Sequence, residues 1–434
     1  MDYPLPEAFV RYLAGRLGGE LSDFLRSMDA PYRRGLRYNR RKGGNAAAPG
    51  ALDPIPWAAD SVFLSPDSPA GAVPLHEAGA WYLQDPSAML PPAVLNVRPG
   101  ERVLDLCAAP GGKSTALAAA LAGQGLLVCN EPVPARAKIL SRNIERMGVT
   151  NALVVSAWPD ALAERWPEGF DAVLADAPCS GEGMFRRHPE TRAEWRPESP
   201  AGCAARQREI LHAAARLVRP GGRLVYATCT LNETENEDTV AAFLQAHPEF
   251  SLSPFRLPGA DAPEGLFTCW PHRFPGEGQF AALLVKRGEG AAALPADRSL
   301  PAPDRQQLRI LSEFAGGALP EGLRMLGDTA VSLAEIPRLQ GLKVLRCGLH
   351  LGEIRGRLLA PDHAWALAAA DLPFPRFPVT EAQAAAFQAG EPLEAPETLR
   401  GWVLPELSGF ALGWGKASGG QLKNHYPKGL RRPR

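Results

Sequence analysis

The segment VLDLCAAPGGKS, residues 103–114, constrains the fold more than any other part of this 434-residue chain. An apolar run ends at Asp105, a loop of small residues follows, and a helical pattern runs from Ser114 to Leu121. A strand, a glycine turn and a helix in this order let the backbone approach a nucleotide-like ligand closely. Cys179 and Cys229 each follow a later strand. A ligand loop with two strand-end thiols points to a cysteine-dependent group transfer.

Short apolar runs alternate with helical patterns along the middle of the chain, which predicts an α/β fold with a mostly parallel, doubly wound sheet. The expected strands are 103–106, 125–130, 152–155, 170–176, 222–227 and 280–285, and the expected helices are 134–147, 201–218 and 233–246. The chain divides into a small helical N-terminal region (1–75), a main domain (76–287), a proline-rich linker (288–305) and a unit of short strands and helices (306–434). Residues 342–345 are a strand expected in that last unit.

Composition excludes several classes of protein. The chain carries 47 Lys and Arg against 47 Asp and Glu, so it is not a globally basic nucleic-acid binder. No apolar stretch approaches the roughly 18 residues that span a bilayer, and the N-terminus does not resemble a secretion signal. Seven cysteines, an odd number, make no disulfide framework. We therefore expect a cytoplasmic protein with reduced thiols.

Positive charge is concentrated at two places on this neutral chain. The first cluster is Arg33, Arg34, Arg37, Arg40, Arg41 and Lys42, and the second is Lys423, Lys428, Arg431, Arg432 and Arg434, with His425 and Tyr426 between them. Such clusters suit a phosphate-lined partner held by limited surfaces. The alternative is that both are solvated charge runs without a partner.

Three kinds of ligand compete for the loop after Asp105. A phosphate-binding NTPase loop requires glycine where Cys107 stands. A dinucleotide fingerprint requires Gly-x-Gly-x-x-Gly, which residues 110–112 do not supply. S-adenosylmethionine remains: Glu131 ends the next strand, 20 residues after Gly111, where an acid binds ribose hydroxyls.

The carboxyl ends of parallel strands meet at one edge of a sheet, so five strand-end residues are expected to gather there. These residues are Asp105, Glu131, Asp176, Cys179 and Cys229. A buried cysteine more often fills a core than reacts, and that reading covers Cys107, Cys129, Cys203, Cys269 and Cys347. It fits Cys179 and Cys229 poorly, because both lie in turns directly after strands.

Thr230 to Glu233 read as a capping box that opens a helix, whose N-terminus would stabilise a thiolate at Cys229. The acids between 233 and 238 partly oppose that effect. Cys269 and His272 are a close cysteine–histidine pair, and no second pair lies near them at a zinc spacing. We expect no metal site.

Three motifs make the chain resemble the Nol/Nop/Sun family of RNA cytosine-5 methyltransferases: DLCAAPGGK at 105–113, DAPCSGEGMF at 176–185 and TCTLNETEN at 228–236. LRYN at 36–39, YLQDPSA at 82–88 and WPH at 270–272 look like its flanking motifs. The resemblance covers roughly residues 5–287 and implies a Rossmann-like methyltransferase domain. The tail, through GWGK at 413–416 and LKNHYPK at 422–428, resembles the bacterial methyltransferase F type. That branch implies a C-terminal PUA-like RNA-binding domain and a small-subunit ribosomal RNA substrate.

The resemblance also implies roles for single residues. Cys229 would attack C6 of cytosine, Asp176 would hold or protonate N3 and also contact the cofactor, and Cys179 would assist release of the base. The methionine end of S-adenosylmethionine would be held by Cys107, Ala108, Ala109, Pro110, Gly111, Gly112 and Lys113, and the ribose by Glu131 with help from Arg136. One departure stands out. The family often places an acid near the adenine after the third strand, but residues 156–159 read SAWP and Asp160 comes late, so the adenine contact stays open.

Three rival functions remain. A DNA cytosine-5 methyltransferase uses the cysteine of Pro-Cys as its nucleophile and would not need Cys229. A transfer-RNA cytosine-5 methyltransferase would share the mechanism. A ribosome-assembly factor that binds RNA without catalysis would not need the catalytic side chains. We expect RNA as the partner, no DNA or membrane, and a monomer.

Overall fold

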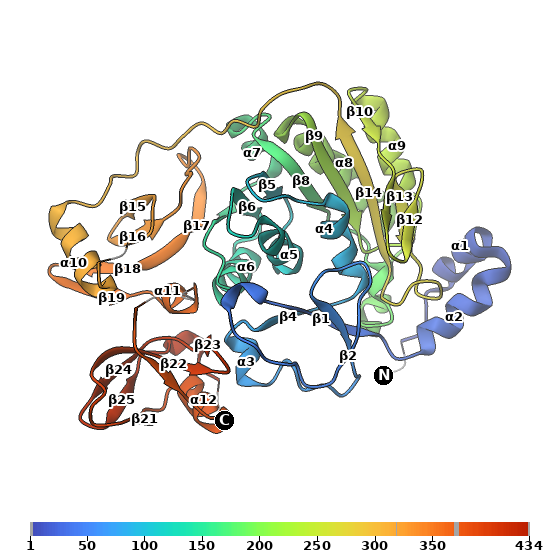
Figure 1. The fold of residues 1–434 in the computed structure, drawn as a ribbon. Helices are drawn as coiled ribbons and strands as arrows, with labels where there is room; N and C mark the ends of the chain where they lie inside the picture. Colours follow the sequence, from blue (N-terminus) through green and yellow to red (C-terminus); the bar gives the residue numbers. More distant parts are fainter. Residues whose placement is uncertain (1–2, 318, 369–372, 433–434) are drawn as a thin grey trace.

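The computed structural model describes residues 3–317, 319–368 and 373–432, and its centre is one mixed sheet (Figure 1). Nine strands form this sheet in the order β10-β14-β9-β8-β5-β6-β7-β17, with β13 paired to β14. Their bounds are β5 (Arg102–Asp105), β6 (Leu126–Asn130), β7 (Ala152–Ser156), β8 (Phe170–Asp176), β9 (Val218–Thr228), β10 (Phe250–Leu252), β13 (Leu266–Cys269), β14 (Gln279–Lys286) and β17 (Lys343–Cys347). β5 to β9 pair in parallel, while β14 and β17 run antiparallel to their neighbours. The predicted mostly parallel sheet is confirmed.

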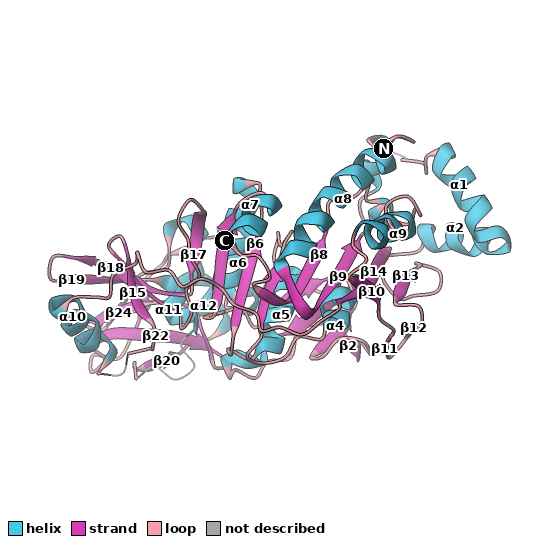
Figure 2. Cartoon of the chain, turned by 90° about the horizontal axis from the view of Figure 1, so that it is seen from above, coloured by secondary structure: helices cyan, strands magenta, loops and turns pink. Residues whose placement is uncertain are grey.

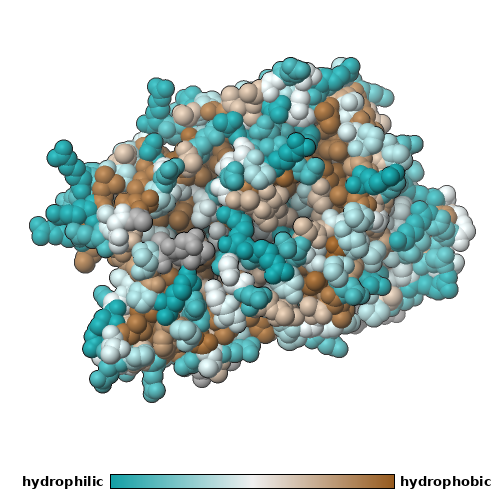
Figure 3. All heavy atoms as spheres, in the orientation of Figure 1, coloured by the Kyte–Doolittle hydropathy of each residue, from teal (hydrophilic) through white to brown (hydrophobic). Residues whose placement is uncertain are grey.

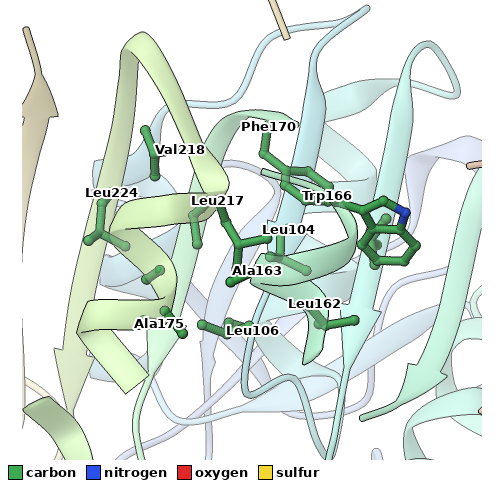
Figure 4. Close-up of a cluster of buried hydrophobic side chains, with 14 of the residues drawn as sticks. Leu104, Leu106, Leu162, Ala163, Trp166, Phe170, Ala175, Leu217, Val218 and Leu224 are labelled. Carbon is green, nitrogen blue, oxygen red and sulfur yellow. The ribbon is translucent and has the colours of Figure 1, made fainter. Parts of the chain in front are cut away.

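Helices cover both faces of the sheet because its central strands are apolar on both sides, as a parallel sheet requires. Leu104 and Val128 pack on one face with α7 (Pro159–Arg165), α8 (Ser199–Leu217) and α9 (Glu237–Ala246). Their neighbours Val103 and Leu127 pack on the other face with α4 (Leu90–Leu95), α5 (Gly112–Leu121) and α6 (Pro134–Arg146). Figure 4 shows part of the first of these cores. Full burial of each such leucine or valine contributes about 1.5–3 kcal/mol.

The N-terminal region combines two helices with a small sheet. α1 (Glu7–Leu17) and α2 (Leu21–Asp29) pack their phenylalanines on Phe185 and Trp270 of the main domain. Behind them, the sheet order is β2-β3-β1-β4, with β1 (Arg34–Tyr38), β2 (Ala51–Pro54), β3 (Ser61–Leu64) and β4 (Trp81–Gln84). A short helix, α3 (Pro74–Glu77), precedes β4.

Two cations of the first basic cluster bind oxygen atoms of the protein itself. Arg37 is buried and donates to Gly112 O and to Thr115 Oγ1, both at 2.7 Å, so it braces the start of α5. Lys42 donates to two backbone carbonyl oxygens, also at 2.7 Å. Both interpretations of this cluster, phosphate binding and simple solvation, therefore fail for these two residues, because their donors are used within the protein.

The C-terminal half begins with a long connection that crosses the molecule from β14 to α10 (Figure 1). A four-stranded sheet follows, in the order β15-β16-β18-β19, and then a second sheet in the order β20-β22-β24-β25-β21, with β23 paired to β22. The bounds are α10 (Arg305–Ala315), β15 (Leu323–Leu326), β16 (Thr329–Ser332), β18 (Leu349–Arg355), β19 (Leu358–Pro361), α11 (His363–Ala368), β20 (Arg376–Pro378), α12 (Glu381–Ala389), β21 (Leu393–Glu394), β22 (Gly401–Leu407), β23 (Phe410–Ala411), β24 (Gly415–Ser418) and β25 (Gln421–Asn424). Seen from above, α10 and β19 lie at the end of the molecule opposite α1 and α2 (Figure 2).

The strand expected at 342–345 exists but belongs elsewhere. β17 runs antiparallel to β7 at the edge of the central sheet, with Val344 opposite Val155 and Cys347 opposite Leu153. β17 pairs there because Leu339 and Cys347 are buried in the hydrophobic core beneath that edge. The expectation that this strand folds within the C-terminal unit is therefore wrong.

The last sheet docks on the N-terminal region. Val403, Ala417 and Leu422 share a core with Leu36 and Trp81. The second basic cluster takes part in this contact: Arg432 pairs with Glu77 at 2.6 Å and Tyr426 is buried, while Arg434 lies outside the described residues. None of the described helices is long and apolar enough to cross a membrane.

Candidate active site

The loop between β5 and α5 is held in a shape that requires glycine. Gly111 has a φ of 111°, which other residues rarely adopt, and a Cβ there would lie 3.2 Å from Leu140 Cδ1. The Ala108 N–H donates to Asn130 O, and the Asn130 side chain donates to Leu106 O, at 2.8 and 3.0 Å. The loop is therefore fixed to the end of β6, where the ligand-binding acid was expected.

Carboxylates gather at the ends of β5, β6 and β8. Asp105 is fully buried, accepts a 2.6 Å hydrogen bond from Ser114 Oγ, and its Oδ1 has no partner among the described residues. Burial, followed by the charges of Asp176 and Glu131, raises the pKa of Asp105 to about 7. Lys113 Nζ lies 2.7 Å from Asp176 Oδ2. Burial opposes the charge on Lys113, but Asp176 outweighs it and raises the pKa of the lysine.

A cavity of about 630 Å³ opens beside β6 and β7. Glu131 lines it, buried, and its carboxylate accepts from the Val133 N–H at 3.0 Å and lies 3.4 Å from Arg136 Nη1. Trp158 forms part of the wall with 74% of its surface exposed, and Asp160 stands next to it. In the region where the adenine contact was left open, Trp158, Pro159 and Asp160 therefore line this cavity.

A second cavity, of about 330 Å³, meets the first at Asp176 and Cys229. Of the predicted loop residues, Cys107 and Ala109 line both cavities, Ala108, Pro110, Gly112 and Lys113 line only the second, and Gly111 lines neither. Asp85, Arg187 and Gln279 also line the second cavity, and sequence reasoning did not single them out. Asp85 stands inside the flanking motif at 82–88, which was the available signal.

The two strand-end cysteines contact each other. Cys179 follows β8, Cys229 follows the neighbouring strand β9, and their Sγ atoms are 3.3 Å apart. The hydrogen bond to Cys229, followed by burial, raises the pKa of the Cys179 thiol well above its usual value. Cys179 therefore keeps its proton at neutral pH, and its S–H can donate a hydrogen bond to Cys229 Sγ.

The segment after Cys229 differs from the expectation. α9 begins at Glu237, and the residues before it form turns rather than a first helical turn. Thr230 Oγ1 donates to a carboxylate of the neighbouring loop and caps no helix. The predicted helix-terminus effect on Cys229 is therefore wrong. Two of the acids that were expected to oppose a thiolate, Glu233 and Glu237, pair with Arg16 at 2.7 and 2.5 Å.

A buried glutamate of the Cys229 loop holds the Cys179 loop. Glu235 is fully buried and accepts from the Ser180 N–H at 3.0 Å, from the Ser180 hydroxyl, from Gln207 Nε2 at 2.7 Å and from Asn232 Nδ2 at 2.8 Å. Burial raises the pKa of Glu235, and these hydrogen bonds oppose the rise.

A second buried glutamate makes the reciprocal link. Glu182 of the Cys179 loop accepts from Thr230 Oγ1 at 2.6 Å, from the Leu231 N–H at 3.1 Å and from Trp195 Nε1 at 3.0 Å. Sequence reasoning missed Glu182 and assigned Glu235 only an opposing charge. Their positions inside the two cysteine motifs were the signal available for both.

Four family profiles match successive parts of the chain. They are described as the N-terminal domain of 16S rRNA methyltransferase RsmF (residues 5–86), 16S rRNA methyltransferase RsmB/F (92–285), the RsmF rRNA methyltransferase first C-terminal domain (303–368) and the methyltransferase RsmF PUA domain (374–432). The division of the chain at 75, 287 and 305 stays a prediction.

Curated relatives match over nearly the whole chain. Ribosomal RNA small subunit methyltransferase F of Klebsiella pneumoniae is 33% identical over 98% of this chain and 96% of its own length. The proteins of the same name from Shigella boydii and Aeromonas hydrophila are both 34% identical over 98% of this chain, and over 96% and 97% of their own lengths.

Solved structures support the fold. A methyltransferase homolog protein from Pyrococcus horikoshii matches with a TM-score of 0.56 and 26% identity, over 65% of this chain and 95% of that one. NSun6 from the same organism, solved with SFG, matches with a TM-score of 0.55 and 20% identity, over 65% of this chain and 99% of that one, and shows the fold alone.

These matches confirm the resemblance stated from the motifs, together with the predicted enzyme class, an S-adenosylmethionine-dependent RNA cytosine-5 methyltransferase. They also confirm the PUA-like domain near the C-terminus. The roles of the single site residues and the oligomeric state stay predictions. With full-length relatives at 33–34% identity, this chain belongs to the ribosomal RNA small subunit methyltransferase F family.

Proposed function

We propose that this chain methylates C5 of a cytosine in small-subunit ribosomal RNA, with Cys229 as the nucleophile. The observation that carries the proposal is the 3.3 Å contact between Cys229 and Cys179 where the two cavities meet. C5 of cytosine is a poor nucleophile, and addition of a thiolate to C6 divides the barrier into two lower ones. Two thiols in contact suit this chemistry, because one adds to the base and the other serves its release.

The larger cavity fits S-adenosylmethionine. Its volume of about 630 Å³ lies in the range of small-molecule sites, and the buried Glu131 carboxylate suits ribose hydroxyls. The unpartnered Oδ1 of Asp105, which lines the adjoining smaller cavity, suits an ammonium group that reaches in from the larger one. Because Asp176 and Glu131 already oppose ionisation of Asp105, the site favours a ligand that brings positive charge. When bound, S-adenosylmethionine supplies an electrophilic methyl group.

Trp158 is the proposed contact for the adenine. Its indole stands in the wall of the larger cavity, on the β7 side of Glu131, and 74% of its surface is free to stack on a ring. Aromatic stacking is worth about 0.5–1.5 kcal/mol beyond area burial. Asp160, two residues on, offers a carboxylate to an exocyclic amine. A tryptophan and a displaced acid would thus do here what an acid directly after the strand does elsewhere in the family.

The smaller cavity would receive the cytosine, which must leave its stack to enter it. Lys113 Nζ lies 2.7 Å from Asp176 Oδ2, and the side chain of Asp176 would accept a hydrogen bond from N3 as the ring gains a proton there. Cys229 Sγ would bond to C6. Once C5 carries its new methyl group, a base would take the C5 proton, the freed electron pair would restore the C5–C6 double bond, and the C6–S bond would break with its electrons returning to Cys229 as a thiolate. Cys179 in its thiolate form would be that base, because its raised pKa makes the thiolate a good proton acceptor.

The test uses cells that lack this protein and carry the wild type, Cys229→Ala or Cys179→Ala, with 5-methylcytosine mapped at single-nucleotide resolution in all RNA. We expect one or a few small-subunit positions to depend on the protein and to be restored only by forms with Cys229. In vitro, Cys229→Ala should form no covalent RNA adduct, whereas Cys179→Ala should accumulate one because release is slowed.

Each rival function predicts a different result in this experiment. A changed transfer-RNA map with an unchanged ribosomal map would keep the mechanism and overturn the substrate. Loss of the adduct with Cys179→Ala alone would exchange the roles of the two thiols. Absence of methyl transfer to any RNA would leave an assembly factor without catalysis.

A further inference from the structure

Gln279 is a polar side chain at the start of a buried apolar strand. β14 reads QFAALLVK, and every residue between Gln279 and Lys286 is apolar. Gln279 exposes 2% of its surface and lines the smaller cavity together with Asp176 and Cys229. The face of the molecule drawn in Figure 3 mixes hydrophilic and hydrophobic side chains over most of its area, so a single polar group is more informative inside the protein than on this surface. A buried polar group destabilises a fold unless hydrogen bonds satisfy it.

One end of the Gln279 amide is engaged within the protein. Nε2 donates to Thr228 O at 2.8 Å. Because a carbonyl oxygen can only accept, this bond fixes which end of the amide is directed at β9. Oε1, the other end, accepts no hydrogen bond from the residues that the structure describes. An acceptor of this kind at a cavity suits a ligand that carries a donor.

The register of the sheet sets Gln279 beside Cys229. The antiparallel strands β14 and β9 pair as far as Phe280, which lies opposite Thr228. The same register carried one residue further sets Gln279 opposite Cys229. Residues opposite each other on neighbouring strands project to the same side of a sheet, so the amide and the thiol share one face.

The backbone before Gln279 is tied to Cys229 as well. The Gly278 N–H donates to Gly183 O, and the Gly183 N–H donates to Cys229 O, both at 3.0 Å. The loop after Cys179 therefore links the start of β14 to the residue that follows β9. This link holds the amide and the thiol in a fixed relation.

Asp176 lies on the same face, but on the other side of the thiol. Leu174 and Ala281, two residues along the strand from Asp176 and Gln279, pack in the same core, and alternate residues of a strand share a face. β9 lies between β8, which carries Asp176, and β14, which carries Gln279. A base above Cys229 therefore has a carboxylate on one side and an amide on the other.

This arrangement determines which part of a bound nucleotide would meet the amide. In the proposed complex, C6 of the cytosine lies at Cys229 and N3 is directed at Asp176. C6 is opposite N3 in the ring, so the edge turned away from Asp176 consists of C5, C6 and N1. C5 must face the cofactor cavity to receive the methyl group, whereas N1 carries the ribose. The ribose is therefore the donor-bearing part of the nucleotide on the Gln279 side.

We propose that Gln279 recognises the ribose of the target nucleotide, with Oε1 accepting a hydrogen bond from the 2′-hydroxyl. The inference rests on the proposed function, since it takes the substrate to be a cytidine of RNA that reacts at Cys229. A deoxyribonucleotide has no donor at this position and leaves Oε1 without a partner in the closed site. Gln279 is then a specificity-determining residue, which favours RNA over DNA at the reacting nucleotide itself.

The test changes the sugar of one nucleotide. Small-subunit ribosomal RNA is ligated from segments so that the mapped target carries cytidine, 2′-deoxycytidine or 2′-fluorocytidine, and is presented in the state, naked or protein-bearing, that the wild type methylates. The fluoro analogue keeps the sugar conformation of RNA but cannot donate. We expect kcat/KM of the wild type to fall about tenfold on both analogues, as for one lost hydrogen bond. Kd for the whole RNA should stay the same, because a single contact among many is changed.

Gln279→Met removes both polar ends of the amide from a side chain of similar size. Its kcat/KM on cytidine should fall about tenfold, and cytidine and the two analogues should then react equally well. The matched control is Gln245→Met at the exposed end of α9, which should keep the wild-type preference for ribose. Deoxycytidine beside the target, in place of the neighbouring nucleotide, should have no effect. Thermal unfolding and binding of S-adenosylhomocysteine check that the variants fold.

Two results would overturn the inference. One is a preference for ribose that Gln279→Met keeps in full. The other is normal reaction of the wild type with 2′-fluorocytidine, which would assign the preference to sugar conformation. Methylation of the cytidine substrate by the wild type keeps the proposed function in both cases, whereas its absence would overturn the proposed function and the inference together.

Discussion

The catalytic loops and the mouth of the cofactor cavity are built in opposite ways. Glu182 and Glu235 tie the two cysteine loops to each other through buried hydrogen bonds, so that each loop carries the carboxylate that holds the other. At the cavity mouth, Trp158 and Val133 expose 74% and 46% of their surfaces. The thiols are thus held by buried hydrogen bonds, while the wall of the cofactor cavity includes exposed apolar side chains.

Buried carboxylates and exposed aromatic side chains therefore serve different purposes in this site. A buried carboxylate with all its donors in place rigidifies what it joins, and loses much of its value if one partner is removed. An exposed aromatic side chain adds affinity only when a ligand covers it. Variants in the buried network should therefore lose stability and turnover, whereas variants in the wall of the cofactor cavity should lose ligand affinity.

The largest expected effect belongs to the buried network. Glu235→Ala leaves the Ser180 N–H without its acceptor and takes one acceptor each from Gln207 and Asn232. Because an unsatisfied buried donor costs about 1–3 kcal/mol, the free energy of unfolding should fall by about 2 to 4 kcal/mol, and kcat should fall by at least about 100-fold. Urea unfolding and single-turnover methylation measure the two quantities. Glu233→Ala, in the same loop but half exposed, is the control and should change kcat little. Wild-type stability and turnover in Glu235→Ala would show that the buried network does not hold the two cysteine loops in place.

Asp105 should give the next largest effect, and one that depends on pH. Its folded pKa of about 7 lies above the ordinary value of 3.8, so its contribution to stability is complete below pH 4 and is lost as pH rises through 7. Ionisation of this carboxyl should cost the apo protein up to about 4 kcal/mol between pH 4 and pH 8, at 1.36 kcal/mol per pKa unit. Asp105→Asn cannot ionise, so the two unfolding free energies should converge or cross as pH rises. Parallel curves over this range would contradict the prediction.

Trp158 should give the smallest effect, confined to the cofactor. Trp158→Ala should raise the Kd of S-adenosylhomocysteine about tenfold, because the stacking surface is lost, while unfolding by urea and the covalent RNA adduct stay unchanged. Trp158→Phe should keep most of the affinity. Calorimetric titration measures both. Equal affinity of the alanine variant and the wild type would place the adenine elsewhere in the cavity.

Much of the fold could be predicted because apolar runs of five to seven residues, such as Phe170–Asp176, have few alternatives to a buried parallel strand. The pattern at 342–345 identified a strand but not its partner, since nothing local records that β7, far away in the sequence, has a free edge. Arg37 was misjudged for a related reason. An arginine in a charge run looks exposed, and only the packed structure supplies the carbonyl and hydroxyl oxygens that bury it.

The candidate site divides in the same way. Asp105, Asp176 and the two cysteines could be placed together because strand ends in a parallel sheet share one edge. Glu182 and Glu235 could not, since a glutamate between glycines, or among threonines and asparagines, is usually a surface residue, and its burial depends on donors contributed by another loop. The helix expected to begin at 233 begins at 237, because Thr230 binds Glu182 of the neighbouring loop and Glu233 pairs with Arg16 instead of capping it.

The pairing of β17 with β7 bears on how this chain is made. β7 is complete once residue 156 has been synthesised, yet the strand that covers it ends only at Cys347. During translation, the outer edge of β7 therefore has no partner strand until nearly two hundred further residues have been synthesised. The chain reaches its mature form only after most of it has left the ribosome, the particle whose RNA its family modifies.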